Sequence, residues 1–394
     1  MDYLRAARPP PGGPRAPSSL DAVCEHGPTR TVTVSISETD PIAWADPARR
    51  LAFDAWMQRV APAHALDLAS LRSASADASF RRYFRVDALP GQASFIVMDA
   101  PPALENVRAF VDIAARIARA GLNAPRVLAQ DLAHGFLLLT DLGTLPYLSA
   151  LQDAQAQGDT GRRDALMGDA LRALVQWQCR VDAGGLPPYD EALLQRELAL
   201  FPQWCVRTEL GVTWGDTEQR VWDQATQALV RSALAQTTVA VHRDYMPRNL
   251  MVCAQADPPA LPNPGILDFQ DAVRGPISYD VASLLRDAFI SWDEALELDW
   301  GARYWELARR AGLRLPDDFG EFWRQLEWMG LQRHLKVLGI FCRLKHRDGK
   351  PRYSQDLPRF FNYAHRASAR YNELRPLSRL LEPLMGAARI EVFG

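Results

Sequence analysis

Between residues 46 and 143, short runs of apolar and β-branched residues are separated by polar turns. Five of these runs have the length and composition of strands. They cover residues 67–72, 80–86, 95–98, 127–131 and 135–140. Apolar residues recur at helical spacing in residues 47–60, after Asp46 as a candidate N-cap, and again in residues 107–120. The pattern predicts a sheet of about five strands with one crossing helix, preceded by another helix.

After Gly143 the apolar spacing becomes helical over long segments. Predicted helices cover residues 164–182, 190–201, 217–235, 279–288, 292–311 and 319–341, with further helical sequence from residue 357 onward. A small antiparallel sheet lobe followed by a large helical lobe predicts a bilobed α+β fold. The cleft between two lobes is a common ligand site.

The N-terminal segment differs in composition from the rest of the chain. Residues 1–19 are rich in Pro, Gly, Ala and Arg and contain few large apolar side chains. Such a segment cannot bury enough surface to offset its chain entropy. We therefore expect a disordered tail over residues 1–45, a sheet lobe over residues 46–143 and a helical lobe over residues 144–394.

The composition is that of a globular protein, with 48% hydrophobic residues, 23% charged residues and a formal net charge of −2. This balance argues against nucleic acid or an acidic membrane surface as the main partner. The five cysteines are scattered and form no CxxC pair, which fits a reducing cytoplasm. No apolar run approaches the roughly 20 residues of a membrane helix. The sequence leaves the oligomeric state open.

Residues 237–252 contain the pattern His-x-Asp-x₄-Asn, formed by His242, Asp244 and Asn249, between two apolar runs. A further acidic residue, Asp268, ends the next short apolar run. Phosphoryl transfer needs a carboxylate beside the attacking hydroxyl and oxygen ligands for Mg²⁺. Asp244 fits the first role, and Asn249 and Asp268 fit the second. We expect His242 to brace the loop by hydrogen bonds.

The same His-x-Asp-x₄-Asn loop occurs in protein kinases. The surrounding residues are more similar to the aminoglycoside phosphotransferase and choline-kinase-like family, because Gly275-Pro276 is followed closely by Asp280 at the start of a helix. Residues 137–143 resemble the hinge between the two lobes of that family. The resemblance covers residues 46–350. It implies a protein-kinase-like fold, ATP and Mg²⁺ as cofactors, a nucleotide-binding N-terminal lobe, a structural role for Asp280 and nucleotide contacts at Thr140, Asp141 and Leu142.

Four further stretches resemble one group within this family, the bacterial anomeric kinases of N-acetylmuramate and N-acetylglucosamine. These stretches are residues 79–85, 98–102, 268–272 and 347–353. The resemblance implies a small-molecule sugar substrate phosphorylated on its C1 hydroxyl, in cell-wall recycling. Two alternatives remain open at this point, namely an aminoglycoside or other small-alcohol kinase, and a pseudokinase that only binds nucleotide.

Kinases of this fold usually hold the phosphates with a lysine on the third strand. Here Met98 falls at that place, and the first 335 residues contain no lysine. Either the chain is an impaired kinase or an arginine replaces the lysine. Residues 80–86 contain Arg81, Arg82 and Arg85.

Strand alternation places Phe80, Arg82 and Val86 on one face. Phe80 and Met98 are further candidates for nucleotide contacts. If Val86 covers the adenine, Arg82 faces the phosphates, so we favour Arg82. The alternative is that all three arginines of this strand are solvated. Residues 73–79 stand where a Gly-rich loop usually lies, and Ser75 and Ser79 are candidate hydroxyl donors to phosphate, unless this run is only a turn. Glu105 is interpreted as an acid favoured by the dipole of the following helix.

Residues near the predicted base are candidates for acceptor binding. Arg243 and Arg248 flank Asp244, and either could contact an anionic group such as a lactyl carboxylate, while Arg243 could instead pair with Asp271 or another acid of the loop. Trp204 could stack on a sugar face or pack in the core. Asp271 is a further candidate for acceptor binding, and the mixed charge around it disfavours a polycationic acceptor. The segment after Gly275-Pro276 is too short for the activation segment of a protein kinase.

Overall fold

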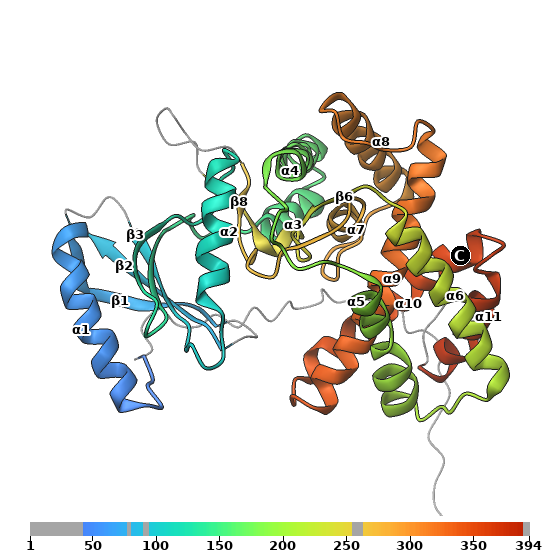
Figure 1. The fold of residues 1–394 in the computed structure, drawn as a ribbon, viewed down its shortest axis with the longest axis horizontal. Coiled ribbons are helices and arrows are strands. Elements are labelled where there is room, and N and C mark those ends of the chain that lie inside the picture. Colours follow the sequence, from blue (N-terminus) through green and yellow to red (C-terminus); the bar gives the residue numbers. More distant parts are fainter. Residues whose placement is uncertain (1–41, 77–79, 90–93, 254–262, 389–394) are drawn as a thin grey trace, which may run out of the picture. The chain divides into compact units, whose positions relative to one another are not determined.

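The computed structural model describes residues 42–76, 80–89, 94–253 and 263–388. Five strands form one antiparallel sheet in the spatial order β1-β2-β3-β5-β4 (Figure 1). Their bounds are β1 (Leu66–Ala76), β2 (Arg82–Ala88), β3 (Ser94–Asp99), β4 (Val127–Asp131) and β5 (Phe136–Thr140). The five strands predicted from the sequence are therefore confirmed.

Helices α1 (Pro47–His64) and α2 (Val107–Arg119) cover opposite faces of this sheet (Figure 1). The Asp46 side chain caps α1 by accepting from the backbone N–H groups of Ala48 and Arg49. Ile42 and Trp44 pack against the cluster formed by α1 and the sheet, although they lie in the segment expected to be a tail. Residues 1–41 lie outside the described part of the chain.

The second lobe is mainly helical. It contains α3 (Tyr147–Gln157), α4 (Thr160–Arg180), α5 (Glu191–Leu198), the π-helix η1 (Phe201–Glu209), α6 (Asp216–Leu234), α7 (Tyr279–Leu285), α8 (Glu294–Arg310), α9 (Phe319–His346), the 3₁₀-helix η3 (Pro351–Asp356), α10 (Leu357–Arg370) and α11 (Arg375–Ala387). The sequence pattern did not predict α3. It predicted a break after residue 201, where the chain instead continues as the wide turns of η1. The small sheet lobe and larger helical lobe agree with the predicted α+β fold.

Two short strand pairs hold the loops between the helices. β6 (Thr238–Val241) pairs with β9 (Val273–Pro276), and β7 (Leu250–Met251) pairs with β8 (Gly265–Ile266). The 3₁₀ turn η2 (Pro247–Asn249) leads into β7. As a result, the loop after β6 and the loop after β8 start from paired strands, and the site residues lie on these two loops.

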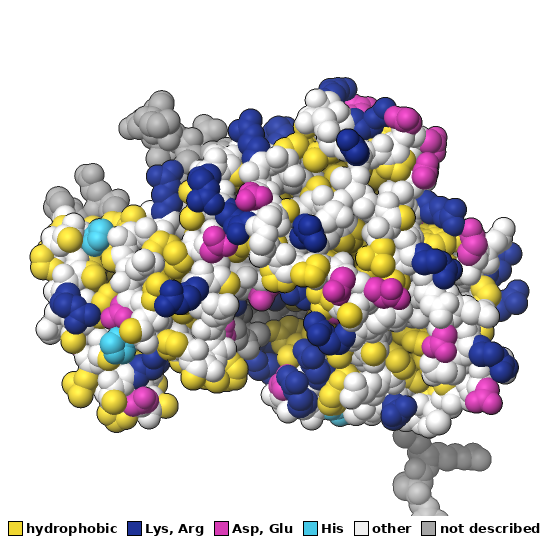
Figure 2. Space-filling model, viewed as in Figure 1, with side chains coloured by type: hydrophobic (Ala, Val, Ile, Leu, Met, Phe, Trp, Pro, Cys, Tyr) yellow, Lys and Arg dark blue, Asp and Glu magenta, His cyan; other side chains and the backbone are white. Residues whose placement is uncertain are grey.

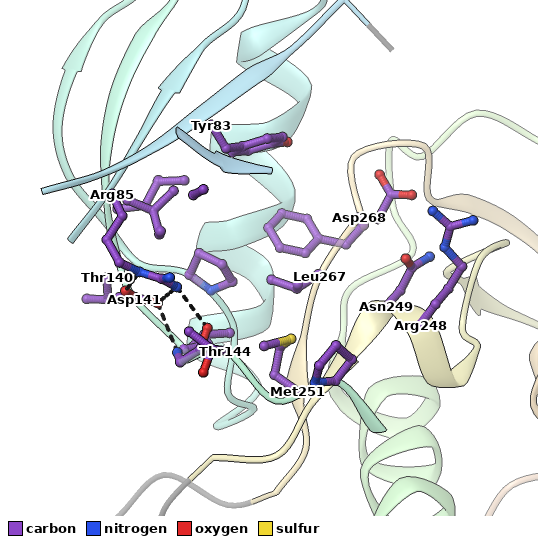
Figure 3. Close-up of a pocket in the computed structure, with 18 of the residues that line it drawn as sticks. Tyr83, Arg85, Thr140, Asp141, Thr144, Arg248, Asn249, Met251, Leu267 and Asp268 are labelled. Carbon is purple, nitrogen blue, oxygen red and sulfur yellow. Dashed lines mark hydrogen bonds and ion pairs between the residues drawn. The ribbon is translucent and has the colours of Figure 1, made fainter. Parts of the chain in front are cut away.

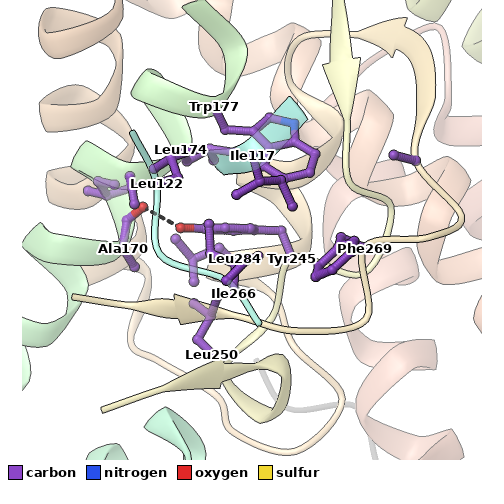
Figure 4. Close-up of a cluster of buried hydrophobic side chains, with 14 of the residues drawn as sticks. Ile117, Leu122, Ala170, Leu174, Trp177, Tyr245, Leu250, Ile266, Phe269 and Leu284 are labelled. Atoms are coloured by element: carbon purple, nitrogen blue, oxygen red, sulfur yellow. Dashed lines mark hydrogen bonds between the residues drawn. The ribbon is translucent and has the colours of Figure 1, made fainter. Parts of the chain in front are cut away.

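One buried cluster joins the sheet lobe to the helical lobe (Figure 4). It includes Ile117 of α2, Trp177 of α4, and Tyr245 and Phe269 of the two loops. The Tyr245 hydroxyl donates to the Ala170 carbonyl oxygen at 2.8 Å. Because large apolar side chains anchor both loops in this core, the polar residues beside them have fixed positions.

The visible surface carries basic and acidic side chains in a mixed arrangement (Figure 2). This mixture accords with the formal net charge of −2. Among the described residues, no helix has both the length and the apolar character needed to cross a membrane.

Candidate active site

A buried carboxylate accepts hydrogen bonds from the backbone of the loop that carries Asp244. Asp280, in the first turn of α7, accepts from the backbone N–H of His242 at 2.7 Å and from that of Arg243 at 3.0 Å. Full burial raises the pKa of Asp280 to about 7, although these two donors lower it. Arg243 has a φ of +77°, a left-handed conformation that is unfavourable for a non-glycine residue. The two hydrogen bonds stabilise this turn and so direct Asp244.

His242 connects the same loop to the residue before Asp268. Its Nε2 lies 3.0 Å from the Leu267 carbonyl oxygen, and the Asp244 backbone N–H donates to its Nδ1 at 3.3 Å. Burial lowers the pKa of His242 to about 4, so the ring is neutral with its proton on Nε2. These contacts are those expected of a bracing residue, and the fully buried ring cannot reach a substrate.

Asn249 and Asp268 line one cavity of about 400 Å³ (Figure 3). The Asn249 Nδ2 donates to the Asp244 carbonyl oxygen at 2.9 Å, which fixes the amide and leaves its oxygen directed elsewhere. Asp268 has a φ of +60°, and its Oδ1 accepts from Gln270 Nε2 at 2.9 Å. Amide and carboxylate oxygens are the ligands that Mg²⁺ prefers, so this donor set fits the metal expected from the sequence.

The sheet and the hinge form the other wall of the cavity. Figure 3 shows Tyr83 and Arg85 of β2 facing the loop residues across the cavity. Thr140, Asp141 and Leu142 also line it, at the position expected of a hinge. Burial alone would raise the pKa of Asp141, but hydrogen bonds from Arg85 and Ser94 lower it below its usual value. Asp141 therefore stays charged and fixes the end of β5 to β2.

Arg82 does not face this cavity, so the predicted face of β2 is wrong. Its Nε donates to Asp99 Oδ2 at 2.9 Å, and its guanidinium lies 4.0 Å from the centre of the Trp44 ring. Val86 is buried in the cluster beneath α1 and does not line the cavity. The alternation along the strand is as predicted, but the assignment of faces is reversed, because a shift of one residue exchanges the two faces of a strand.

Two other residues predicted to bind nucleotide do not line the cavity. Met98 is fully buried in the core between the lobes, with Tyr83 as its register partner. Phe80 is 64% exposed, and its backbone N–H donates to Glu105 Oε1 at 3.1 Å. Ser79 and the side chain of Ser75 lie outside the described part of the chain, so both remain predictions.

Arg81 is a buried charge that the sequence prediction passed over in favour of its neighbour. Its Nε lies 3.6 Å from Glu105 Oε2, and its Nη2 lies 3.4 Å from Asp268 Oδ1. Glu105 thus contacts Arg81 and the backbone of Phe80 in addition to preceding α2. The sequence alone indicated only a favourable interaction with the dipole of α2. Strand alternation could have pointed to Arg81. It places Arg81 on the same side as Tyr83 and Arg85, which line the cavity.

Arg243 pairs with an acid from another element, not with Asp271. Its Nη2 lies 2.8 Å from Glu197 Oε1, and Lys336 Nζ lies 2.9 Å from the same oxygen. Glu197 is buried in α5, and its charge is balanced there by two cations. No local sequence pattern indicated this contact, because Glu197 of α5 and Lys336 of α9 are distant along the chain.

The other candidate acceptor residues are on or near the surface. Arg248 is exposed, lines the cavity beside Asn249, and has its guanidinium 5.0 Å from the centre of the Phe289 ring. Asp271 is exposed and accepts from Gln270 Nε2 at 3.2 Å. Trp204 lies in η1 and packs against the cluster beneath α9, which agrees with the core-packing alternative.

Comparison with known proteins places these features in a family. Residues 70–313 match the sequence model of the phosphotransferase enzyme family. An N-acetylmuramate/N-acetylglucosamine kinase of Pseudomonas putida is 49% identical over 320 residues, which cover 81% of this chain and 90% of that protein. The enzyme of the same name from Pseudomonas aeruginosa is 52% identical over 318 residues, covering 80% and 89%.

A solved structure has the same fold at low identity. The GDP complex of wild-type aminoglycoside 2'-phosphotransferase-IIIa matches with a TM-score of 0.53 at 13% identity, over 80% of this chain and 98% of that one. The matched family region includes most of the sheet lobe, both site loops and α7. The chain therefore belongs to the phosphotransferase enzyme family.

Proposed function

We propose that this phosphotransferase is an ATP-dependent sugar kinase acting on the anomeric hydroxyl of N-acetylmuramate, N-acetylglucosamine or both. One observation carries the chemistry: the loop of Asp244 is bonded to Asn249, which lines one cavity with Asp268. This is the arrangement that phosphoryl transfer to a hydroxyl needs. The choice of sugar is supported by the two Pseudomonas relatives, which are about half identical to this chain and named as kinases of these sugars.

In this proposal Asp244 is the general base. The C1 hydroxyl oxygen forms a bond to the γ-phosphorus, and the bond from that phosphorus to the β,γ-bridging oxygen breaks. ADP leaves, and the hydroxyl proton passes to a carboxylate oxygen of Asp244. His242 takes no proton because its pKa is about 4. Its two hydrogen bonds, together with those of Asp280, hold the loop during transfer.

The cavity has suitable walls for ATP. Apolar side chains from both lobes, including Ile96, Leu139 and Met251, can enclose a base, and Thr140 to Leu142 lie at its edge. The polar end of the same cavity contains Asn249 and Asp268. These two would hold Mg²⁺, which when bound supplies positive charge against the phosphates. The base would therefore lie toward the hinge and the phosphates toward the two loops.

On the acceptor side, the contacts favour Arg248 over Arg243 for an anionic group. Arg243 is already paired with the buried Glu197. Arg248 is exposed, next to Asn249, and stacked on Phe289. A lactyl carboxylate would accept from its guanidinium, and N-acetylglucosamine, which lacks that group, would not. Arg248→Ala should therefore weaken the binding of N-acetylmuramate more than the binding of N-acetylglucosamine.

We also propose that the enzyme works in the cytoplasm, where ATP is available. The four described cysteines, Cys179, Cys205, Cys253 and Cys342, are free thiols, which fits a reducing compartment. Phosphorylated amino sugars from the cell wall would be its products in a recycling pathway.

The proposal is tested by steady-state kinetics with ATP on four acceptors: N-acetylmuramate, N-acetylglucosamine, kanamycin and choline. We expect kcat/KM to be highest for one or both N-acetylated sugars. Kanamycin or choline as the only good acceptor would refute the sugar assignment. Asp244→Asn should lower kcat by roughly 10² to 10⁴ while ATP binding persists. The surface variant Asp223→Asn, on α6, is the matched control and should retain wild-type turnover.

A further inference from the structure

The buried arginine before strand β2 has no assigned role in the mechanism above. We propose that Arg81 holds the α- and β-phosphates of the nucleotide in place of the usual strand lysine, and that Glu105 positions it. This inference deepens the proposed function and rests on its nucleotide site. It follows from three observations on the sheet lobe.

The first observation is that the usual lysine position carries no charge. Met98 of β3 is fully buried in the apolar core and pairs in register with Tyr83 of β2. The sequence contains no lysine before Lys336. A cation for the phosphates must therefore be an arginine if it comes from this lobe.

The second observation is the place of each arginine of this segment. Arg82 lies on the opposite face, bonded to Asp99 beneath Trp44. Arg85 is paired with Asp141 at the hinge end of the cavity. Arg81 alone of the three contacts an acid of the metal-binding loop, with its Nη2 3.4 Å from Asp268 Oδ1. Its guanidinium therefore lies beside Asp268, which lines the cavity where the phosphates are expected, although Arg81 itself is not a lining residue.

The third observation is the contact between Arg81 and the acid before α2. In kinases, a glutamate of this helix pairs with the strand lysine, and the pair must form for activity. Here Glu105 Oε2 lies 3.6 Å from Arg81 Nε, and Glu105 Oε1 accepts from the backbone N–H of Phe80. Glu105 thus holds both the side chain of Arg81 and the backbone before it. The pair has the connections of the lysine–glutamate pair, with its cation just before the neighbouring strand β2.

Chemistry supports arginine in this position. A guanidinium stays charged even when only 8% exposed, as Arg81 is, and it donates to phosphate oxygens in a bidentate manner. Its 3.4 Å approach to Asp268 is long for a charge-assisted hydrogen bond. Phosphate oxygens can therefore compete with Asp268 for this donor, while Glu105 keeps the side chain in place.

The test measures binding, not turnover. Titration calorimetry without acceptor sugar gives Kd values for ADP and for adenosine, which has no phosphates. Arg81→Met should raise the Kd for ADP by about 10- to 100-fold, because hydrogen bonds to charged phosphate groups are lost. Adenosine binding should remain unchanged. Arg82→Met is the matched control one residue away, and it should leave the Kd for ADP at the wild-type value while lowering Tm.

Two outcomes would overturn the inference. One is an unchanged Kd for ADP in Arg81→Met. The other is an equal loss of ADP and adenosine, which would mean that Arg81 only stabilises the cleft. If Arg81→Met does not fold, Arg81→Lys keeps a cation and serves the same comparison, with ADP weakened less than 10-fold expected. An equal loss of ADP and adenosine binding in Arg81→Lys would overturn the inference in the same way.

A double-mutant cycle tests the role of Glu105. Glu105→Gln should raise the Kd for ADP in the wild-type background. It should have no further effect on that Kd in Arg81→Met, because Glu105 acts through Arg81. Equal effects in both backgrounds would contradict a positioning role. All these measurements concern nucleotide alone, so they remain decisive even if the acceptor is not an amino sugar.

Discussion

At the scale of single residues, the neutral His242 makes stability depend on pH in a defined direction. Its pKa is about 4 in the folded protein, below the ordinary 6.5. As the pH falls from 6.5 to 4, the unfolded chain takes up this proton first, so the free energy of unfolding decreases. The difference between the two pKa values corresponds to about 3 kcal/mol in the free energy of unfolding. This amount is fully lost only near pH 4.

His242→Gln removes this titration while keeping a donor for the Leu267 carbonyl oxygen. We expect the variant to lose stability less steeply than the wild type between pH 6.5 and 4, in urea unfolding measured at several pH values. Asp280 has a raised pKa of about 7 and acts in the opposite sense, but it is present in both proteins. Parallel stability curves for the two proteins would contradict the assignment of a buried neutral ring.

The residues of the two loops could be placed from the sequence because their spacing is local. The order His242, Asp244, Asn249 predicts a short loop, and Asp268 follows a short apolar run further along the chain, on the loop after β8. Arg82 could not be excluded in this way. The face that it occupies depends on pairing between β2 and β3 and on the cover of α1, which are contacts between distant segments.

At the scale of elements, helix α9 passes very close to the start of η1. A Cβ built on Gly339 would lie 2.4 Å from the carbonyl carbon of Leu200, a backbone atom that cannot turn away. Glycine is therefore required at this crossing for close approach of two backbones. The crossing positions η1, and with it Trp204, against the cluster beneath α9.

Gly339→Ala should lower the free energy of unfolding by about 3 kcal/mol, since a well-packed crossing must open to admit a methyl group. Chemical denaturation of the purified protein measures this loss. Gly386→Ala is the control, because a Cβ at this exposed helical position would meet nothing within 4 Å. It should change stability by less than about 1 kcal/mol, in the stabilising direction. Similar values for both variants would contradict the close approach.

The elements themselves were largely predictable from apolar spacing. The strands and the long helices follow period 2 and helical patterns over enough residues to be recognised. Helix α3 was missed because the buried side of this short helix includes two alanines, Ala150 and Ala154, which give a weak pattern. The π-helix was missed because Pro202 suggested a break in the helix. Proline is tolerated in the first turn, because the N–H that it lacks would have no partner within the helix there.

At the scale of the whole molecule, the shared core explains how a small lobe can serve a site built mainly by the large one. Phe110 of α2 lies 4.7 Å, centre to centre, from the ring of Phe269, which follows Asp268. The helix that Glu105 precedes is thus packed against the loop that carries the proposed metal ligand. The fold and the family were predictable from motif and lobe order, whereas these contacts between lobes required the structure.

In the proposed mechanism, Asp244 directs phosphoryl transfer to the C1 hydroxyl of an N-acetylated sugar. A ³¹P–¹H correlation spectrum of the product formed from ATP and the better of the two N-acetylated sugars shows which oxygen receives the phosphate. We predict a phosphorus coupled to the anomeric proton, no product with the 1-O-methyl glycoside of that sugar, and product formation at least about 100-fold slower with Asp244→Asn. A phosphorus coupled to the protons of another carbon, or a phosphorylated methyl glycoside, would contradict the account.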